Sequence, residues 1–103
     1  MLESKYQAYI IKKLKYLFPG CMVLKNDSSY IQGIPDLLVL FGPCWAALEV
    51  KPSRAARTQS NQEYYVRILS EMSFAAFIHP DNEEEVFDAM EQAFAAGWNA
   101  RVS

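Results

Sequence analysis

The sequence predicts a single α/β domain, and three observations support this. At 103 residues, the chain has room for one hydrophobic core. Its hydrophobic fraction of 51% and aromatic fraction of 14% favour a compact globule over a disordered chain. Segments with helical apolar spacing alternate with short apolar runs, in the order helix, three strands, helix, strand, helix. The whole chain, residues 1–103, is therefore predicted to form one domain.

Apolar residues recur every three or four positions near the N-terminus, with lysines between them. They are Leu2, Tyr6, Ile10, Leu14 and Leu17. This spacing predicts an amphipathic helix over residues 2–18, which ends at Pro19-Gly20. CMVLK (21–25) predicts a short strand, and the polar residues 26–33 predict a turn-rich connection.

Two apolar runs with a Gly-Pro turn between them predict a β-hairpin. LLVLF (37–41) shows little alternation, which is typical of a strand that is covered on both faces. Gly42-Pro43 forms the turn, and WAALEVK (45–51) forms the next strand. Pro52 ends the pairing of this strand because proline has no N–H donor.

A second helix follows a polar and basic connection. Residues 53–59 are predicted to be mobile. Ser60 and Glu63 have the spacing of a capping box, which predicts a helix from Ser60 to about Glu71. Thr58 is an alternative cap one turn earlier.

The last third of the chain predicts a strand and a helix. FAAFI (74–78) is an apolar run of strand length. Asp81 and Glu84 predict a second capping box. The helix that they open is predicted to run to Ala96 and to end at Gly97, because glycine is common just after a helix.

The overall charge indicates no particular partner, but its distribution is uneven. The net charge is −2. Basic residues fall early and in the middle, at Lys5, Lys12, Lys13, Lys15, Lys25, Lys51, Arg54, Arg57 and Arg67. Acidic residues concentrate late, at Glu83, Glu84, Glu85, Asp88 and Glu91. This arrangement suits a polyanionic ligand, and ordinary solvated faces explain it equally well.

Cysteine usage and hydropathy predict a cytoplasmic protein that has no membrane segment. Cys21 and Cys44 lack the spacing of a zinc site, and no signal peptide precedes them. We expect both thiols to be free. No apolar run reaches the roughly 18 residues that are needed to span a bilayer.

Three charged residues around the predicted hairpin indicate a catalytic site. Successive strand residues face opposite sides, so Glu49 and Lys51 share one face of their strand. Asp36 opens the preceding strand, and hairpin pairing would bring it close to Glu49. Two carboxylates among apolar residues need a cation, and oxygen ligands suit Mg²⁺ or Mn²⁺. The carbonyl of Val50 is a further candidate ligand, and Lys51 would orient a nucleophilic water or stabilise charge on a phosphate.

Further polar residues are candidates for supporting roles. Glu3 shares a helix face with Gln7 and could supply an additional carboxylate to the metal site. Gln62 lies in the first turn of the second helix, where it could hold the water, Lys51 or a phosphate. Arg54 and Arg57 are candidates for contacting a nucleic-acid backbone, and the basic Lys25 is a third. Each residue alone also has a purely structural explanation, as a turn, capping or surface residue.

Together these residues resemble the PD-(D/E)XK nuclease superfamily, and specifically its stand-alone VRR-Nuc members. Pro35-Asp36 matches the PD, and Glu49-Val50-Lys51 matches the ExK about a dozen residues later. Residues 33–37, GIPDL, match the pattern with which VRR-Nuc domains enter the strand. Further matches to the family pattern are Glu3, Gln7, Pro52 and Gln62. Gln59 is an alternative to Gln62, one turn earlier.

The resemblance implies a restriction-endonuclease-like αβββαβ core, with a mixed sheet flanked by helices. It also implies an endonuclease that depends on Mg²⁺ or Mn²⁺ and hydrolyses phosphodiester bonds of DNA, with selectivity for branched or four-way-junction DNA and a homodimeric state. By the family pattern, Asp36 and Glu49 would bind metal, Lys51 would be catalytic, and Glu3 and Gln62 would support the site. The alternative is a non-catalytic nucleic-acid-binding module that has kept the fold. The presence of both acids and the lysine favours the enzyme.

Overall fold

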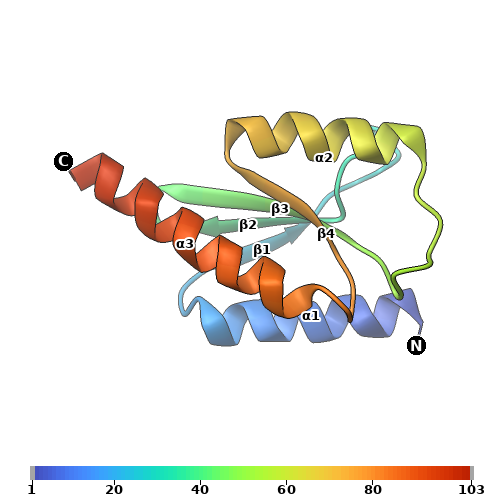
Figure 1. Ribbon diagram of the computed structural model, residues 1–103, viewed down its shortest axis with the longest axis horizontal. Coiled ribbons are helices and arrows are strands. Elements are labelled where there is room, and N and C mark those ends of the chain that lie inside the picture. Colours follow the sequence, from blue (N-terminus) through green and yellow to red (C-terminus); the bar gives the residue numbers. More distant parts are fainter. Residues whose placement is uncertain (1, 103) are drawn as a thin grey trace.

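The computed structural model describes residues 2–102 and confirms the predicted order of elements (Figure 1). The elements are α1 (Glu3–Leu17), β1 (Met22–Lys25), β2 (Leu37–Phe41), β3 (Cys44–Val50), α2 (Ser60–Met72), β4 (Phe74–Ile78) and α3 (Glu83–Val102). Within the described range, every helix is too short or too polar to span a lipid bilayer. Cys21 and Cys44 are both free thiols, as predicted.

The four strands form one mixed sheet in the order β1-β2-β3-β4. β1 pairs with β2 and β2 with β3 in antiparallel fashion, whereas β3 and β4 are parallel and are joined through α2. The predicted hairpin is therefore confirmed. Its register pairs Leu37 with Leu48 and Phe41 with Cys44. The carboxyl end of β3 thus lies beside the start of β2.

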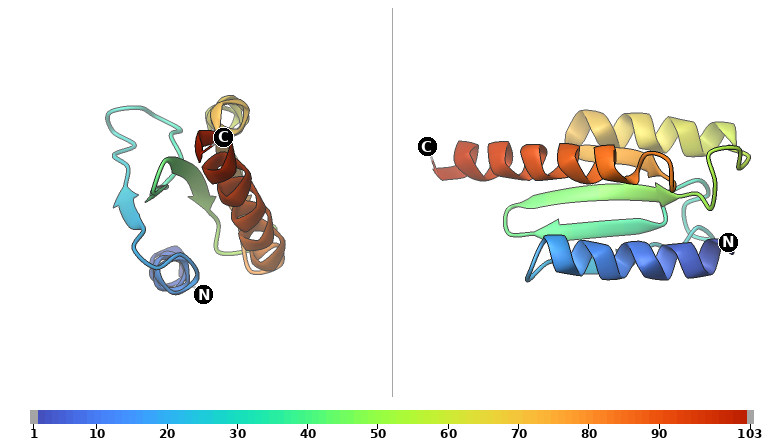
Figure 2. Two further views of the ribbon diagram at one scale, coloured as in Figure 1. Left: turned by 90° about the vertical axis from the view of Figure 1, so that its left-hand side faces the viewer. Right: turned by 60° about the horizontal axis from the view of Figure 1, so that its bottom comes forward.

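Helices cover the two faces of the sheet unequally (Figures 1 and 2). α1 and α3 lie on one face, and α2 lies on the other, over β3 and β4. The α1/α3 face holds the core, because it buries one side of every strand from β2 to β4. The largest fully buried apolar side chains of this core are Tyr6, Ile10, Leu14, Leu37, Val39, Leu48, Val50, Ile78 and Met90.

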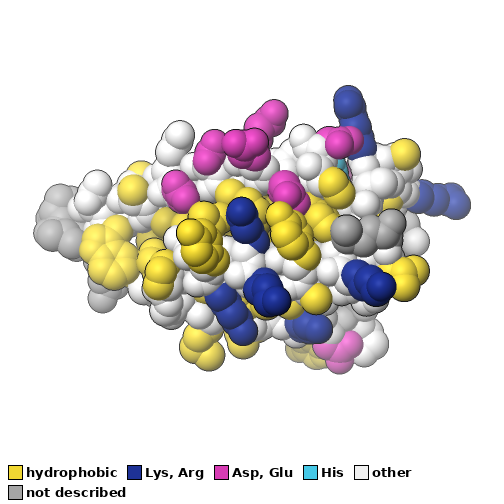
Figure 3. Space-filling view, turned by 90° about the horizontal axis from the view of Figure 1, so that it is seen from below, with side chains coloured by type: hydrophobic (Ala, Val, Ile, Leu, Met, Phe, Trp, Pro, Cys, Tyr) yellow, Lys and Arg dark blue, Asp and Glu magenta, His cyan; other side chains and the backbone are white. Residues whose placement is uncertain are grey.

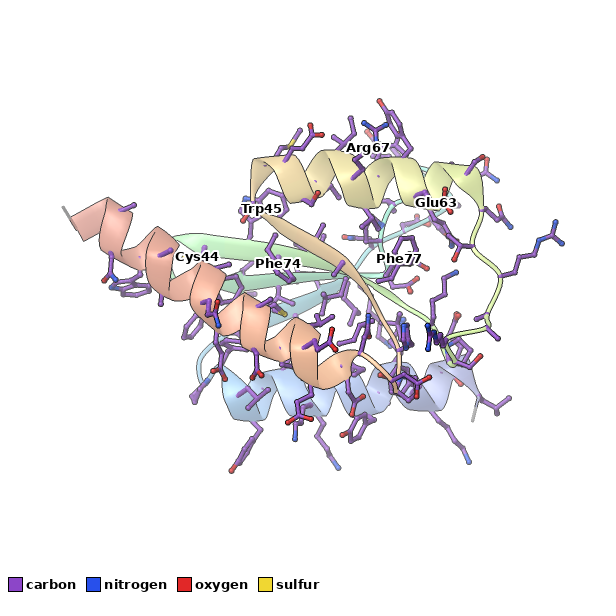
Figure 4. The ribbon with its side chains drawn as sticks, in the orientation of Figure 1. Cys44, Trp45, Glu63, Arg67, Phe74 and Phe77 are labelled. Atoms are coloured by element: carbon purple, nitrogen blue, oxygen red, sulfur yellow. The ribbon has the colours of Figure 1, made fainter. Side chains whose placement is uncertain are left out.

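The α2 face of the sheet is only partly covered, which corrects the expectation for residues 37–41. Leu37 and Val39 are completely buried against α1 and α3, but Leu38 and Leu40 on the opposite face are half-buried. Figure 4 shows the same division of faces, with Trp45 and Phe77 on the side of α2 and Cys44 on the side of α3. The lack of alternation in this strand therefore reflects one buried face and one apolar face that α2 leaves partly open.

Two predicted helix ends differ from the structure. The N-cap of α2 is Gln59, whose side chain forms a reciprocal capping box with Gln62, so neither Ser60 nor Thr58 is the cap. A glutamine side chain carries the same carbonyl acceptor that aspartate or serine would supply, and the sequence pattern did not include it. The last helix also continues past Gly97. A Cβ on this glycine would lie 3.0 Å from the sulfur of Cys44, so glycine permits close packing here.

The start of α3 is also one residue later than predicted. α3 begins at Glu83, and the Asn82 side chain acts just before it by accepting from the backbone N–H of His79 and donating to the carbonyl of Phe77. Asp81 instead lies in the preceding turn, where its N–H donates to His79 Nδ1. The contacts of Asn82 tie the helix start to the end of β4, a connection that the Asp81–Glu84 spacing does not reveal.

The loop before β2 is held closely against the start of α2. Gly33 has a φ of 93°, a backbone conformation that side chains other than hydrogen rarely adopt. A Cβ at this position would lie 2.8 Å from the side chain and 2.9 Å from the backbone of Asn61. This close approach places the turn that carries Asp36 next to the helix that carries Gln62.

Candidate active site

Asp36 and Glu49 lie opposite each other at the end of the β2–β3 hairpin. The register pairs Leu37 with Leu48, and its next step places Asp36 across from Glu49. Residues that are directly opposite in an antiparallel pair point to the same face, with Cβ atoms about 5 Å apart. The acids therefore share the α2 face of the sheet, as the hairpin prediction required.

Backbone hydrogen bonds hold Asp36 in this position. Its Oδ2 accepts a hydrogen bond of 2.9 Å from the backbone N–H of Val50. Its own carbonyl accepts one of 2.8 Å from the N–H of Asn26, and the Asn26 side chain donates to the carbonyl of Pro35 at 2.8 Å. Asp36 is thereby fixed between β1 and β3, with its second carboxylate oxygen, Oδ1, outside this bond.

Glu49 is a buried acidic residue whose negative charge is only partly compensated by its neighbours. Only 4% of the residue is exposed. Burial first, and then the neighbouring Asp36 carboxylate, raises the pKa of Glu49 from 4.5 to about 8, although the Lys51 ammonium works in the opposite direction. In the protein alone, the acid pair therefore holds a proton at neutral pH. A bound cation would remove this repulsion between carboxylates.

Lys51 is buried beside the acid pair and is held by three contacts. Its Nζ lies 3.8 Å from Glu49 Oε2, and this ammonium donates hydrogen bonds to the carbonyl of Arg57 at 3.0 Å and to Gln62 Oε1 at 2.9 Å. The residue is 7% exposed. Glu49 and Lys51 are the only buried charged residues in the part of the chain whose side chains are described. A buried lysine with fixed donors is organised before any substrate binds.

Gln62 connects the acid and the lysine. Its Nε2 donates to Glu49 Oε2 at 3.2 Å, while its Oε1 accepts from Lys51 and from the backbone N–H of Gln59 at 3.1 Å. The capping box of α2 therefore sets the orientation of the amide. Gln62, and not the alternative Gln59, is therefore the glutamine that contacts the acid and the lysine. The hydrogen bonds of Gln59 are confined to the helix cap.

The other predicted residues lie around this cluster. Glu3 is exposed at the start of α1, and its charge contributes to the raised pKa of Glu49. Arg54 and Arg57 are exposed in the connection from β3 to α2, and the backbone of Arg57 contacts Lys51. Lys25 pairs with Leu37 in the sheet, so it lies at the same end but on the opposite face from the acid pair.

The donor set of the cluster suits a hard divalent cation. Asp36 and Glu49 supply carboxylate oxygens from adjacent strands, and the raised pKa of Glu49 reflects negative charge that a cation would neutralise. Within residues 2–102, no three His, Cys, Asp or Glu side chains come together as a metal site. Magnesium sites commonly use one or two carboxylates together with water and substrate phosphate. The two acids therefore fit such an ion.

An apolar groove of about 450 Å³ lies on the same sheet face as the acid pair. It is lined mainly by Ile31, Ile34, Leu38, Leu40, Trp45 and Leu69. Leu24 of β1 pairs with Leu38 and is 40% exposed, so the apolar surface extends to the edge of the sheet. We call this surface the sheet-face groove.

Comparison with known proteins identifies the fold. No protein-family model and no curated protein matches the sequence. A solved VRR_NUC domain protein superimposes with a TM-score of 0.64 over 90% of this chain and 88% of its own, at 12% identity. Hjc of Archaeoglobus fulgidus, a Holliday junction resolvase from an archaeal hyperthermophile, gives a TM-score of 0.51 over 74% of this chain and 67% of its own, at 13% identity. The chain shares the fold of these two proteins.

Several contacts that hold the site have no signal in the sequence pattern. The backbone N–H of Val50 holds Asp36, which the sequence motif does not indicate. The carbonyl of Arg57 holds Lys51, whereas the sequence singled out only its side chain. Asn26 was assigned to a turn, yet it positions the backbone on both sides of Asp36. Main-chain contacts leave no residue-type signal, so only the Asn26 side chain offered a clue.

Proposed function

We propose that this protein is a metal-dependent endonuclease that hydrolyses phosphodiester bonds in DNA. The observation that carries the proposal is the cluster of Asp36, Glu49, Lys51 and Gln62 at one end of the sheet, in which Glu49 and Lys51 are buried. Two carboxylates, one ammonium and one amide meet there, and each is fixed by hydrogen bonds. An ion pair with a purely structural role would consist of Glu49 and Lys51 alone. Here a second acid, Asp36, lies beside Glu49 and raises its pKa.

The residues of the cluster divide the chemistry among them. Asp36, Glu49 and the Val50 carbonyl would hold Mg²⁺ or Mn²⁺, with Glu3 as an outer carboxylate, and the ion would polarise a phosphate oxygen and acidify a bound water. Lys51 would donate to the attacking water or to the phosphate as negative charge grows on it. Gln62 would hold Lys51 and Glu49 at their present separation. Arg54 and Arg57 would neutralise flanking phosphates.

DNA with a branch is the substrate that we favour. A structure similar to this chain over most of its length is a Holliday junction resolvase. The exposed arginines lie on one side of the site, where they can contact backbone phosphates independently of sequence. A non-catalytic DNA-binding module is the second candidate. It is less consistent with a lysine that is buried beside two acids, because simple phosphate binding requires neither burial nor a carboxylate pair.

Cleavage of defined DNA substrates tests this proposal. Linear duplex, single-stranded, flapped, four-way-junction and closed circular DNA should be incubated with Mg²⁺, Mn²⁺ or EDTA. We expect cleavage with either metal, nicking of the circle and fastest cutting of the branched substrates. Asp36→Asn keeps an acceptor for the Val50 N–H but removes a metal-binding charge, so it controls for contaminating nucleases. Absence of cleavage in every metal, or equal cleavage by Asp36→Asn, would contradict the proposal.

A paired substitution isolates the contribution of Gln62 to the site. Gln62→Ala and Gln59→Ala both remove the capping box of α2, so each should cost about 1 kcal/mol of unfolding free energy. Only Gln62→Ala also removes the contacts to Lys51 and Glu49, and we expect it to slow cleavage by roughly 10- to 100-fold. Denaturant unfolding and initial cleavage rates provide the two measurements. Equal loss of rate in both variants would assign Gln62 a purely structural role.

A further inference from the structure

Glu83, the first residue of α3, ties this helix to α1. Its carboxylate accepts hydrogen bonds from the hydroxyls of Tyr6 at 2.6 Å and Tyr9 at 3.1 Å, and we call these three side chains the Tyr–Glu cluster. Figure 3 looks onto the face on which the two helices lie side by side, with lysines over α1 and acidic side chains over α3. The next two acids of α3, Glu84 and Glu85, are exposed, whereas Glu83 is half-buried. Glu83 is therefore engaged with α1 and is not one of the solvated charges of α3.

The hydroxyl of Tyr6 is a firmly held donor in this cluster. Tyr6 is 1% exposed, and its ring stacks on that of Tyr9 with the ring centroids 6.0 Å apart. Burial first, and then the hydrogen bond to the Glu83 carboxylate, raises the pKa of Tyr6, so its hydroxyl stays protonated at physiological pH. Hydrogen bonds to an ionised acceptor are stronger than those between neutral groups. The contact between α1 and α3 is thus strong at this point.

The start of α3 is fixed in turn to the strands that carry the candidate site. Asn82, directly before Glu83, donates a hydrogen bond of 3.0 Å to the carbonyl of Phe77 in β4. Phe77 pairs with Glu49 in the parallel register of β3 and β4. The carbonyl of the next residue in β4 accepts a hydrogen bond of 2.8 Å from the N–H of Lys51. The Tyr–Glu cluster therefore connects α1 to the strand end that holds the acid and the lysine.

The first turn of α1 has no side-chain cap of its own. The helix begins at Glu3, and its N-cap residue, Leu2, makes no side-chain hydrogen bond to the helix. The first N–H groups of a helix lack intrahelical partners, and helix ends fray. The N–H of Tyr6 closes the first turn by donating to the carbonyl of Leu2 at 3.0 Å. The residue that closes this turn is therefore the residue whose hydroxyl binds Glu83.

This first turn carries Glu3 to the candidate site. Figures 1 and 2 show the start of α1 beside the connection that follows β3. Glu3 is exposed, and its charge acts on Glu49 near the end of that strand. A long exposed side chain has many rotamers, and a frayed turn would add backbone freedom to them. The position of the Glu3 carboxylate thus depends on how firmly the turn beneath it is held.

We propose that Glu83 is a positioning residue for Glu3. Through its bonds to the two tyrosines, it fixes the first turn of α1 and keeps the Glu3 carboxylate beside the acid pair. The part that Glu3 plays there, as an outer carboxylate of a divalent cation, rests on the proposed function. The Tyr–Glu cluster acts on the metal site only through Glu3. Residues that orient the ligands of a metal typically change its affinity 10- to 100-fold, and a contact one step further out should change it less.

Removal of single hydroxyl groups tests this inference in the full chain. Tyr6→Phe removes the shorter hydrogen bond to Glu83 and keeps both the ring and the net charge. Tyr16→Phe is the matched control, because it removes the same atom from a ring on the same helix that is 78% exposed. Glu3→Gln removes the charge that the cluster is proposed to position. Electron paramagnetic resonance of free Mn²⁺, in the absence of DNA, measures the Kd of each protein for this ion.

The expected result is a coupling between Tyr6 and Glu3. We expect Glu3→Gln to raise the Kd for Mn²⁺ roughly 10-fold, Tyr6→Phe to raise it at least about 3-fold, and Tyr16→Phe to leave it unchanged. The Tyr6→Phe/Glu3→Gln variant should bind Mn²⁺ as well as Glu3→Gln alone, because both changes remove the same contribution. In the metal-free protein, hydrogen exchange of the amide at position 6 should accelerate about 10-fold in Tyr6→Phe, since the first turn opens more easily.

Three results would overturn the inference while Mn²⁺ binding by the wild type stands. They are an unchanged Kd in Tyr6→Phe, an unchanged amide exchange at position 6, and effects of Tyr6→Phe and Glu3→Gln that multiply in the double variant. Multiplying effects would mean that the cluster supports the fold independently of Glu3. A wild type that binds no Mn²⁺ would contradict the proposed function as well, so the two failures are distinguishable.

A second variant covers the case in which Tyr6→Phe is unfolded, as judged by circular dichroism. Tyr9→Phe removes the longer hydrogen bond to Glu83 from a ring that is 43% exposed, so it disturbs the core less. We expect a smaller rise in the Kd for Mn²⁺ than in Tyr6→Phe, again absent when Glu3 is already replaced by glutamine. A rise of the same size with and without Glu3 would overturn the inference.

Discussion

Replacing Lys51 with methionine is expected to reduce the single-turnover rate of DNA cleavage by roughly 10³-fold. The Lys51 ammonium is buried, lies 3.8 Å from Glu49 and is already held by Gln62 and the carbonyl of Arg57. A donor that is positioned before the reaction stabilises developing charge without reorganisation, and its loss is felt mainly in the transition state. The measurement is the cleavage rate at saturating enzyme and Mg²⁺.

The same substitution should leave DNA binding nearly unchanged. Binding measured with Ca²⁺ in place of Mg²⁺ reports on phosphate contacts from exposed cations such as Arg54 and Arg57, which Lys51→Met leaves intact. Arg54→Ala is the matched comparison, because it should weaken binding and its salt dependence with a smaller effect on the saturated rate. A Lys51→Met protein that is folded and retains a tenth or more of the wild-type rate would exclude the catalytic role.

The substitution also has a cost in stability that must be measured separately. Methionine fills a similar volume but leaves the carbonyl of Arg57 without this donor and Gln62 Oε1 with only its hydrogen bond from the Gln59 N–H. It also leaves Glu49 without its nearby positive charge. Unpaired buried acceptors cost about 1–3 kcal/mol. Cleavage should therefore be compared at a temperature at which both proteins are folded, and a loss of rate that follows the folded fraction would indicate a structural role alone.

Much of the architecture could be predicted because apolar spacing and turn residues determine it locally. The spacing of Tyr6, Ile10 and Leu14 indicated the first helix, and all three residues are buried in the core. The Gly42-Pro43 turn fixed the hairpin, and with it the meeting of Asp36 and Glu49 follows from strand geometry. The placement of the acid pair was therefore accessible from the sequence.

The remaining features depend on contacts between segments that are distant in sequence. Gly97 resembles a helix terminator, but α3 continues through it, and Cys44 of β3 packs so close that a larger residue would have little room. Gln62 gains its role from Lys51 and Glu49 on the sheet, which the local pattern of α2 cannot specify. The partial exposure of Leu38 and Leu40 depends on where α2 crosses the sheet. Local helix and strand propensities contain no information about these tertiary contacts.

Replacing Glu49 with glutamine is expected to stabilise the metal-free protein at alkaline pH. The ordinary pKa of glutamate is 4.5, and burial beside Asp36 raises the pKa of Glu49 to about 8. Between these two values the folded protein binds more protons than the unfolded chain, so the unfolding free energy of the wild type falls as pH rises through this window. A pKa difference of this size corresponds to on the order of 5 kcal/mol. Glutamine cannot ionise, so the variant escapes this loss.

Thermal unfolding in EDTA at two pH values measures this effect. The Tm of Glu49→Gln should exceed that of the wild type by roughly 20 °C at about pH 9 and by much less at about pH 5, where the wild-type acid is protonated in the folded state. Glu71→Gln removes an exposed carboxylate from α2 and should show the same difference from the wild type at both pH values. Added Mg²⁺ should raise the Tm of the wild type at pH 9 more than that of Glu49→Gln, because it neutralises the ionised pair.

A pH-independent difference in Tm between wild type and Glu49→Gln would mean that Glu49 is ionised in the folded protein throughout this range. The buried acid pair would then be compensated by Lys51 alone and would have no need of a cation.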